Sequence, residues 1–284
     1  MSKNDKVATV SANTGLALPF DYGADAGAGM DVTMDDLRIP MAVLAQTESK
    51  VLIEGEAKYI AGGKPGDILN SATKEYIPGD VGILGIPSSI KTSVIEWLPD
   101  NQGFVAEHAI DSDIAKNARA NGNKTENGND LVKTKTMVLT LVDDNLVPTG
   151  FIVVPFSSSK LAAWSDYFTK IDTAKATRNA PIFANLIRIV SFDDKNRDGK
   201  RYKNYAMFPA LNEAGALLST KGLTAKAAVA DVAAQGSVVK SLLDPTSAGV
   251  LAAKQLREQL LSGVAQIDRE SSAEAAEAEG GRHF

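Results

Sequence analysis

The chain has 284 residues, of which 44% are hydrophobic, and 30 Lys and Arg stand against 35 Asp and Glu, a formal net charge of −5. This length suits one large domain or two small ones. The negative balance argues against a uniformly basic protein, so an anionic ligand needs a local basic patch. The sequence contains no cysteine, which excludes disulfides, zinc–thiolate sites and thiol catalysis.

The N-terminal region resembles neither a signal peptide nor a folded segment. Residues 1–6 (MSKNDK) are followed by no apolar core segment, and no apolar run approaches the ~20 residues that span a bilayer. We therefore expect a soluble, cytoplasmic protein without a membrane partner. Residues 1–35 are small, polar and rich in Gly and Ala, which predicts a flexible acidic arm.

Residues 36–211 are predicted to form a β-rich domain. The turn sequences GGKPGD (62–67) and IPGD (77–80) separate short apolar runs. Strands are expected at residues 67–70, 81–87, 91–97 and 103–109, and the polar stretch 117–130 is expected to be a mobile loop. Two hairpins follow, one pairing residues 133–142 with 146–156 and one pairing 182–192 with 201–209.

Helices are expected between these hairpins and after them. Leu161, Trp164, Phe168 and Ile171 fall at helical spacing and predict a helix over residues 157–171, with Ser157 or Ser158 as its cap. Residues 212–267 are rich in Ala, Leu and Lys and lack aromatics, which predicts a small helical extension, clearest over 247–262. Residues 268–284 are expected to be a disordered acidic tail. The expected class is mainly β with C-terminal helices.

Cations and aromatic residues are concentrated in the second half of the β-domain. Between Lys160 and Lys203 there are ten Lys and Arg against five Asp and Glu. Cations neutralise phosphates and rings stack on unpaired bases, so this composition favours a single-stranded nucleic-acid groove. The expected stacking residues are Tyr205, Tyr202 and Trp97, and the expected phosphate contacts are Lys200, Arg201, Lys203, Arg197 and Lys160.

Strand alternation distinguishes the two tyrosines. Tyr205 shares a strand face with Arg201 and Lys203, whereas Tyr202 lies on the other face. We therefore expect Tyr205 to be the better stacking residue and Tyr202 to be the better candidate for the core.

Residues typical of catalytic sites are scarce. The histidines are His108 and His283, which form no cluster, and no phosphate-cradling loop, dinucleotide fingerprint or nucleophile elbow is found. We expect no metal, no cofactor and no enzymatic activity. One alternative remains open, a magnesium-dependent nuclease that uses Asp143 and Asp144, although adjacent acids are usual in turns.

Several short segments resemble a family of single-stranded DNA-binding proteins of tailed bacteriophages. They are residues 39–46 (IPMAVLAQ), 66–70 (GDILN), 96–99 (EWLP) and 103–105 (GFV). The resemblance covers roughly residues 20–210. It implies an antiparallel OB-like barrel without catalysis, acting in DNA replication or recombination in the host cytoplasm.

The acidic tail is also similar to the partner-recruiting tails of single-strand binders. The resemblance implies that Phe284 docks on a replication or recombination protein and that acids such as Glu277 and Glu279 steer it there. The helical extension is compatible with homo-oligomers. A different class stays open: a virion structural or assembly protein, in which the aromatic residues are buried and DNA binding does not depend on strandedness.

Overall fold

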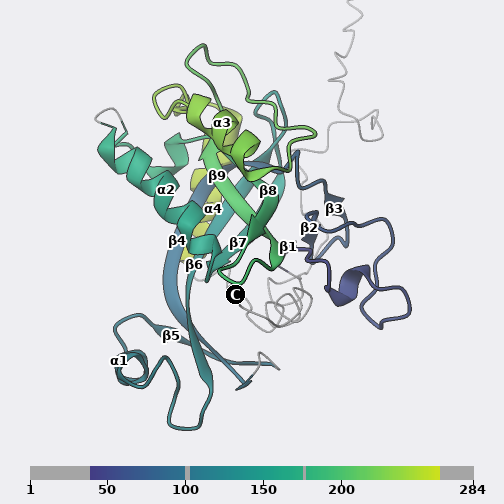
Figure 1. The fold of residues 1–284 in the computed structure, drawn as a ribbon. Coiled ribbons are helices and arrows are strands. Elements are labelled where there is room, and N and C mark those ends of the chain that lie inside the picture. Colours follow the sequence, from purple (N-terminus) through teal and green to yellow (C-terminus); the bar gives the residue numbers. More distant parts are fainter. Residues whose placement is uncertain (1–38, 100–102, 175–176, 263–284) are drawn as a thin grey trace, which may run out of the picture. The chain divides into compact units, whose positions relative to one another are not determined.

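The computed structural model describes residues 39–99, 103–174 and 177–262. These residues form a six-stranded and a three-stranded antiparallel sheet with four α-helices (Figure 1). The expected mainly β class with C-terminal helices is confirmed. Among the described residues, no helix has the length and apolar character needed to cross a membrane.

The large sheet carries the fold, and its strands follow the order β7-β6-β4-β8-β9, with β5 paired to β4. Both predicted hairpins are present, β6–β7 and β8–β9, but the strand expected from residue 182 begins only at Ile187, because Ile182–Ala184 form a 3-10 helix. The strands are β4 (Ile83–Trp97), β5 (Phe104–Ala109), β6 (Asp130–Val142), β7 (Pro148–Ser157), β8 (Ile187–Lys195) and β9 (Arg201–Pro209).

Strand β4 corrects one expectation, because the two strands predicted at 81–87 and 91–97 are a single strand of 15 residues. Its pairing with β6 shifts register between Pro87 and Ser89. Proline lacks the N–H that a ladder needs, so a bulge is where a central strand accommodates it. The Ser88 hydroxyl lies 2.8 Å from the Thr140 hydroxyl within this irregularity.

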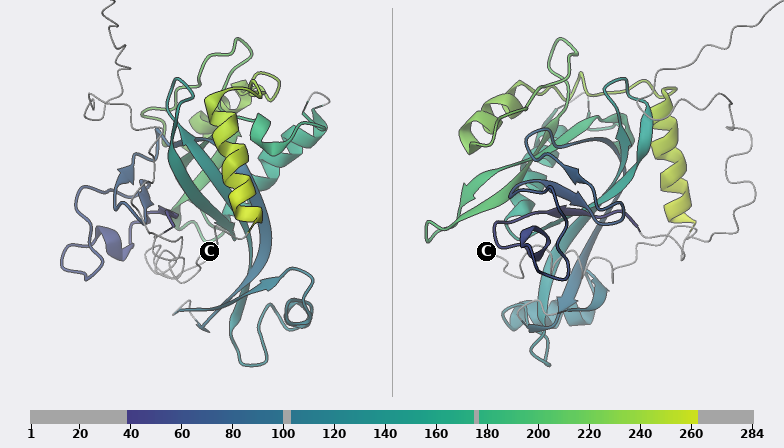
Figure 2. Two further views of the ribbon diagram at one scale, coloured as in Figure 1. Left: turned by 180° about the vertical axis from the view of Figure 1, so that it is seen from behind. Right: turned by 90° about the vertical axis from the view of Figure 1, so that its right-hand side faces the viewer.

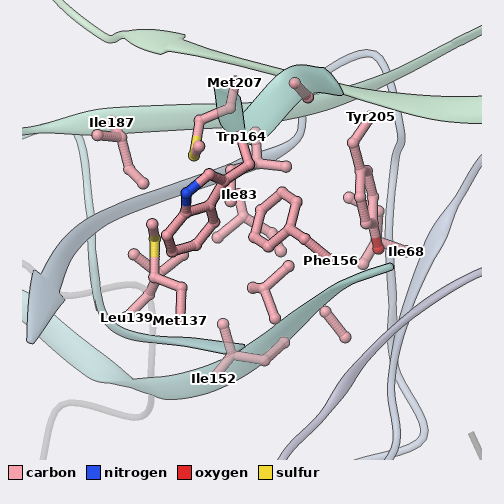
Figure 3. Close-up of a cluster of buried hydrophobic side chains, with 14 of the residues drawn as sticks. Ile68, Ile83, Met137, Leu139, Ile152, Phe156, Trp164, Ile187, Tyr205 and Met207 are labelled. Carbon is pink, nitrogen blue, oxygen red and sulfur yellow. The ribbon is translucent and has the colours of Figure 1, made fainter. Parts of the chain in front are cut away.

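One face of the sheet curves around the main core, which Figure 3 shows. Side chains from five strands of the large sheet meet there, among them Ile83, Met137, Ile152, Ile187 and Tyr205, together with residues 42, 44 and 68 of the three-stranded sheet. Helix α2 (Lys160–Thr173) closes this core with Trp164 and Tyr167. The helix begins later than predicted: Ser159 is its N-cap and makes no side-chain capping hydrogen bond, so neither Ser157 nor Ser158 caps it.

The expected barrel is not closed in the described residues, because the edge strands β7 and β9 do not pair with each other. Strands β1 (Ala42–Leu44), β2 (Ile68–Asn70) and β3 (Tyr76–Ile77) form the small sheet, and the segment around β1 touches both edges. The Val153 N–H donates to the Pro40 carbonyl at 2.8 Å. The Gln46 amide accepts from the Lys203 N–H at 2.8 Å and donates to the Lys203 carbonyl at 3.0 Å.

Two helices cover the opposite face of the large sheet. Helix α3 (Lys226–Gln235) places Val229 against Val190 and Phe208. Helix α4 (Ala248–Leu261), predicted over 247–262, packs Val250 and Ala253 against Ile86. Both faces of the central strands are therefore buried.

Strands β4 and β6 continue past the main core as a long hairpin over residues 91–135, here called the distal hairpin (Figures 1 and 2). It includes β5 and helix α1 (Asp113–Ala120). Val94, Ala115, Ala118 and Leu131 form a small core of its own. The mobile loop expected at 117–130 therefore begins as helix, which the Ser112 hydroxyl caps by accepting from the Ala115 N–H at 3.2 Å.

A buried carboxylate is held inside the distal hairpin. Glu96 Oε1 accepts from Asn129 Nδ2 at 2.7 Å, and Glu96 Oε2 lies 2.7 Å from His108 Nε2. Burial alone raises the pKa of Glu96, but the hydrogen bonds from Asn129 and His108 outweigh it and leave the pKa below its ordinary value. The ionised form of Glu96 therefore stabilises the folded hairpin.

Replacing Gln46 tests how the small sheet is attached to the edge of β9. Gln46→Ala removes both hydrogen bonds to the Lys203 backbone, and we expect the free energy of unfolding to fall by about 1–3 kcal/mol in urea denaturation. Glu48→Ala is the control, because Glu48 is exposed and its ion pair with Lys200 spans 3.6 Å. Equal losses in both variants would contradict the role assigned to Gln46.

The Glu96 cluster predicts a pH dependence. Because the pKa of Glu96 is lowered in the folded state, its stabilisation is complete above the ordinary carboxyl value of about 4.3 and is lost as the pH falls through the lowered value. We expect the fluorescence of Trp97, measured with Trp164→Phe to isolate it, to change over that acidic range. Glu96→Gln should abolish this transition, and an unaltered transition would assign it to another group.

Candidate nucleic-acid interface

The tip of the β8–β9 hairpin is a tight polar turn. Asn196 Oδ1 accepts from the Asp198 N–H at 3.0 Å and from the Lys200 N–H at 2.8 Å. Gly199 has φ +79°, a value that side chains rarely adopt. This turn fixes the direction in which the cations of both strands leave the tip.

Two of the predicted phosphate contacts are engaged in ion pairs. Lys203 Nζ lies 2.7 Å from Asp193 Oδ1, and Lys200 Nζ lies 3.6 Å from Glu48 Oε1. The Lys203 pair is the shorter and more buried of the two, so its charge is the less available to a phosphate.

Three cations of the tip, Lys195, Arg197 and Arg201, are exposed. They make no ion pair with any residue in the described part of the chain. Lys195 and Arg201 are directly opposite each other across the β8–β9 ladder. The tip therefore keeps a net positive group of side chains after its internal ion pairs are formed.

The two tyrosines lie in the reverse of the expected arrangement. Tyr205 is only 1% exposed, its ring centroid lies 5.9 Å from that of Phe156, and Lys160 Nζ lies 5.4 Å from the Tyr205 ring. Tyr202 is half-buried, and its hydroxyl donates to Asp194 Oδ2 at 3.2 Å. The Tyr205 ring is part of the core and is not open to a base.

Asp194, the acceptor of the Tyr202 hydroxyl, is itself part of a small polar cluster. Lys226 Nζ lies 2.8 Å from Asp194 Oδ1, and Asn204 donates to Asp194 Oδ2 at 3.1 Å. Burial raises the pKa of Asp194, but these two partners more than compensate and hold it below its ordinary value. Asp194 is therefore a carboxylate that orients Tyr202 beside the tip.

Trp97 lies far from the tip, and Lys160 is buried beside Tyr205. Trp97 is 6% exposed and packs edge-on against Phe104, with ring centroids 6.2 Å apart. It lies about 40 Å along β4 from the Gly85–Ile187 pair, at a rise of ~3.3 Å per residue. Strand β8 leads from that pair in the opposite sense, so the tip and Trp97 are far apart. Lys160 is 8% exposed at the start of α2.

The positive balance between Lys160 and Lys203 is dispersed, because several cations have structural partners. Lys170 Nζ donates to the Gly236 carbonyl at 2.6 Å, and burial lowers the pKa of Lys170. Arg188 Nη1 donates to the Val81 carbonyl at 2.8 Å, and burial lowers the pKa of Arg188. Charge counts along the sequence therefore overestimate the basic surface.

A second group of cations and rings was missed by the sequence reasoning. Lys133 and Lys135 lie on β6, on the face that continues from Met137 and Leu139, and Lys135 Nζ lies 5.0 Å from the Trp164 ring. Trp164 is stacked on Phe168, with centroids 4.5 Å apart and an interplanar angle of 29°. The signal was present in the sequence as the alternation Lys133-Thr-Lys135 ahead of the apolar part of the strand.

The other predicted sites are the alternative metal site at Asp143 and the residues of the C-terminal tail. Asp143 Oδ1 accepts from the Asn145 and Val147 N–H groups, each at 2.9 Å, as a turn former does. Within the described ranges, no three His or acidic residues are placed to hold a metal ion. Phe284, Glu277 and Glu279 lie outside the described residues, as does the predicted N-terminal arm.

Comparison with known proteins supplies the family. No curated protein and no solved structure matches the chain. A family model described as Pam3 phage gp34-like protein matches residues 10–215, more than half of the chain, and agrees with the expectation of a bacteriophage protein. The chain belongs to the Pam3 phage gp34-like family.

Proposed function

We propose that the protein binds single-stranded DNA through an OB-like arrangement of the large sheet. The observation that carries the proposal is the sequence of elements β4, β6, β7, α2, β8 and β9 in the sheet order β7-β6-β4-β8-β9. A partly open five-stranded barrel with a helix after its third strand is the OB pattern. In that fold, oligonucleotides contact the loops between strands 1 and 2 and between strands 4 and 5.

Of the two loops that contact oligonucleotides in this pattern, the first is large in this protein and the second is positively charged. The first corresponds to the distal hairpin over residues 91–135, and the second to the tip of β8–β9 with Lys195, Arg197 and Arg201. Exposed cations that make no ion pair are available to neutralise phosphates, which releases the counterions condensed on the nucleic-acid strand. The charge distribution therefore supports the second loop as a contact.

The role of the aromatic residues changes in this proposal. Tyr205 and Trp97 are buried, so the stacking expected of them is not part of it. Tyr202 remains the stacking candidate at the tip, since its ring is half-buried and its hydroxyl is held by Asp194. The proposal keeps the acidic tail as the segment that recruits replication or recombination proteins.

Neutralising the tip is the direct test. The triple variant Lys195→Ala, Arg197→Ala and Arg201→Ala removes up to three phosphate contacts, so the slope of log affinity against log salt for oligo-dT should flatten by about 2. The measurement is fluorescence anisotropy at several salt concentrations, with duplex of equal length as competitor.

The matched control carries the same loss of charge on other exposed lysines, Lys50→Ala, Lys221→Ala and Lys240→Ala. We expect its slope to remain close to that of the wild type. Equal flattening in both triple variants would indicate that the tip has no specific role. Absence of salt-sensitive binding to oligo-dT by the wild type would exclude the proposed function.

A second candidate function is a virion structural or assembly protein, and the burial of the aromatic residues favours it. Trp97, Trp164, Tyr167, Tyr205 and Phe208 are each at most 6% exposed. On this alternative the protein is found in purified particles, and duplex DNA competes as well as oligo-dT. Mass spectrometry of purified particles together with the competition assay separates the two functions.

A further inference from the structure

Lys133 and Lys135 are a pair of like charges on neighbouring positions of one strand face. They are two residues apart on one face of β6, a separation of about 7 Å. Lys133 is exposed and Lys135 is half-buried, and in the described part of the chain neither makes an ion pair. Burial and the neighbouring charge of Lys133 lower the pKa of Lys135. Such a pair is relieved by binding an anion.

A ring stack lies beside Lys135, one member of this pair. Trp164 is 4% exposed and belongs to the core, whereas Phe168, stacked on it 4.5 Å away, is half-buried. Tyr167, the preceding residue of α2, meets Phe168 edge-on, with ring centroids 5.3 Å apart. Phe168 is therefore a ring held rigidly by two others, with part of its surface open to solvent.

We infer that Phe168, Lys133 and Lys135 form a second subsite for single-stranded DNA, in which one base extends the Trp164–Phe168 stack and the flanking phosphates bind the two lysines. This inference rests on the proposed function and places a contact at the junction of α2 and the distal hairpin. A cation that can bind phosphate and a ring stack that can extend to a base lie close together there, since Lys135 Nζ is 5.0 Å from the Trp164 ring. A duplex cannot use the site, because its bases are already stacked on one another.

The site also differs in kind from the tip of β8–β9. The tip presents cations on a turn, whereas the junction presents a ring on a helix and two lysines on a strand that pairs with β4 at both lysines and also with β7 at Lys135. Rigid elements hold a stacking ring more firmly than a turn does, so the junction should supply the larger base-dependent part of the affinity.

Two variants separate the two parts of the subsite. Phe168→Leu keeps an apolar side chain in the same place but removes the ring, and Phe168→Tyr keeps the ring. The double variant Lys133→Ala and Lys135→Ala removes the charges, with Lys50→Ala and Lys221→Ala as its charge-matched control. Thermal unfolding checks that every variant is folded.

The probes are labelled oligo-dT and an abasic oligomer with the same number of phosphates. Phe168→Leu should bind oligo-dT about tenfold more weakly, within the range measured for loss of one stacked base, with unchanged binding of the abasic oligomer. Phe168→Tyr should match the wild type. The lysine variant should weaken binding of both probes and flatten the salt slope by about 1.4.

Several outcomes would overturn the subsite. If Phe168→Leu binds both probes as the wild type does, no base stacks on that ring. If the lysine variant and its control have the same salt slope, the pair binds no phosphate. Either result, combined with an effect of the tip variants, leaves the proposed function standing without this subsite. Failure of every protein to bind oligo-dT removes both proposals together.

Discussion

The unpaired edges of the large sheet determine how the rest of the molecule is built. Strands β7 and β9 curve towards the same core but do not hydrogen-bond to each other, so their outer backbone groups need other partners. The β1 segment supplies them on both sides, through the Pro40 carbonyl and the Gln46 side chain. Pro155 adds protection to β7, because proline offers no N–H to a further strand.

The position of helix α2 also follows from the lack of pairing between β7 and β9. A sheet that does not close leaves its core open at one end, and Trp164, Tyr167 and Phe156 fill that end with large rings. The rings that give the sequence its nucleic-acid-like composition are therefore needed first for packing. What remains for a ligand is the partly open ring of Phe168, the half-buried Tyr202 and the exposed cations that make no ion pair with another described residue.

Much of the fold could be predicted from the sequence, because it follows local periodicity. The β6–β7 hairpin is an example: alternating apolar residues flank Asp143, and the turn forms where Asp143 accepts two backbone hydrogen bonds. The continuity of β4 could not be predicted, since Pro87 reads as a strand end unless the bulge and its partner strand are known.

The site was less predictable for a related reason. Alternation correctly assigns Tyr205 and Lys203 to one face of β9, but it does not say what covers that face. The core buries Tyr205, while Asp193 and Gln46 engage Lys203, and both effects depend on residues distant in sequence or on the neighbouring strand. Lys135 and Trp164 lie close together for the same reason: a strand and a helix are brought together only by the tertiary fold.

The distal hairpin has a consequence for how this family can vary in length. Its two long strands run in register from the main core to Trp97, and side chains alternate between its faces. Removing two residues from each strand between the main core and Val94 keeps Val94, Leu131 and the α1 that covers them on the same side of the sheet, whereas removing one from each would turn them together to the opposite side. Shorter and longer relatives are therefore expected to differ by even numbers of residues per strand, because side chains alternate between the two faces with a period of two residues.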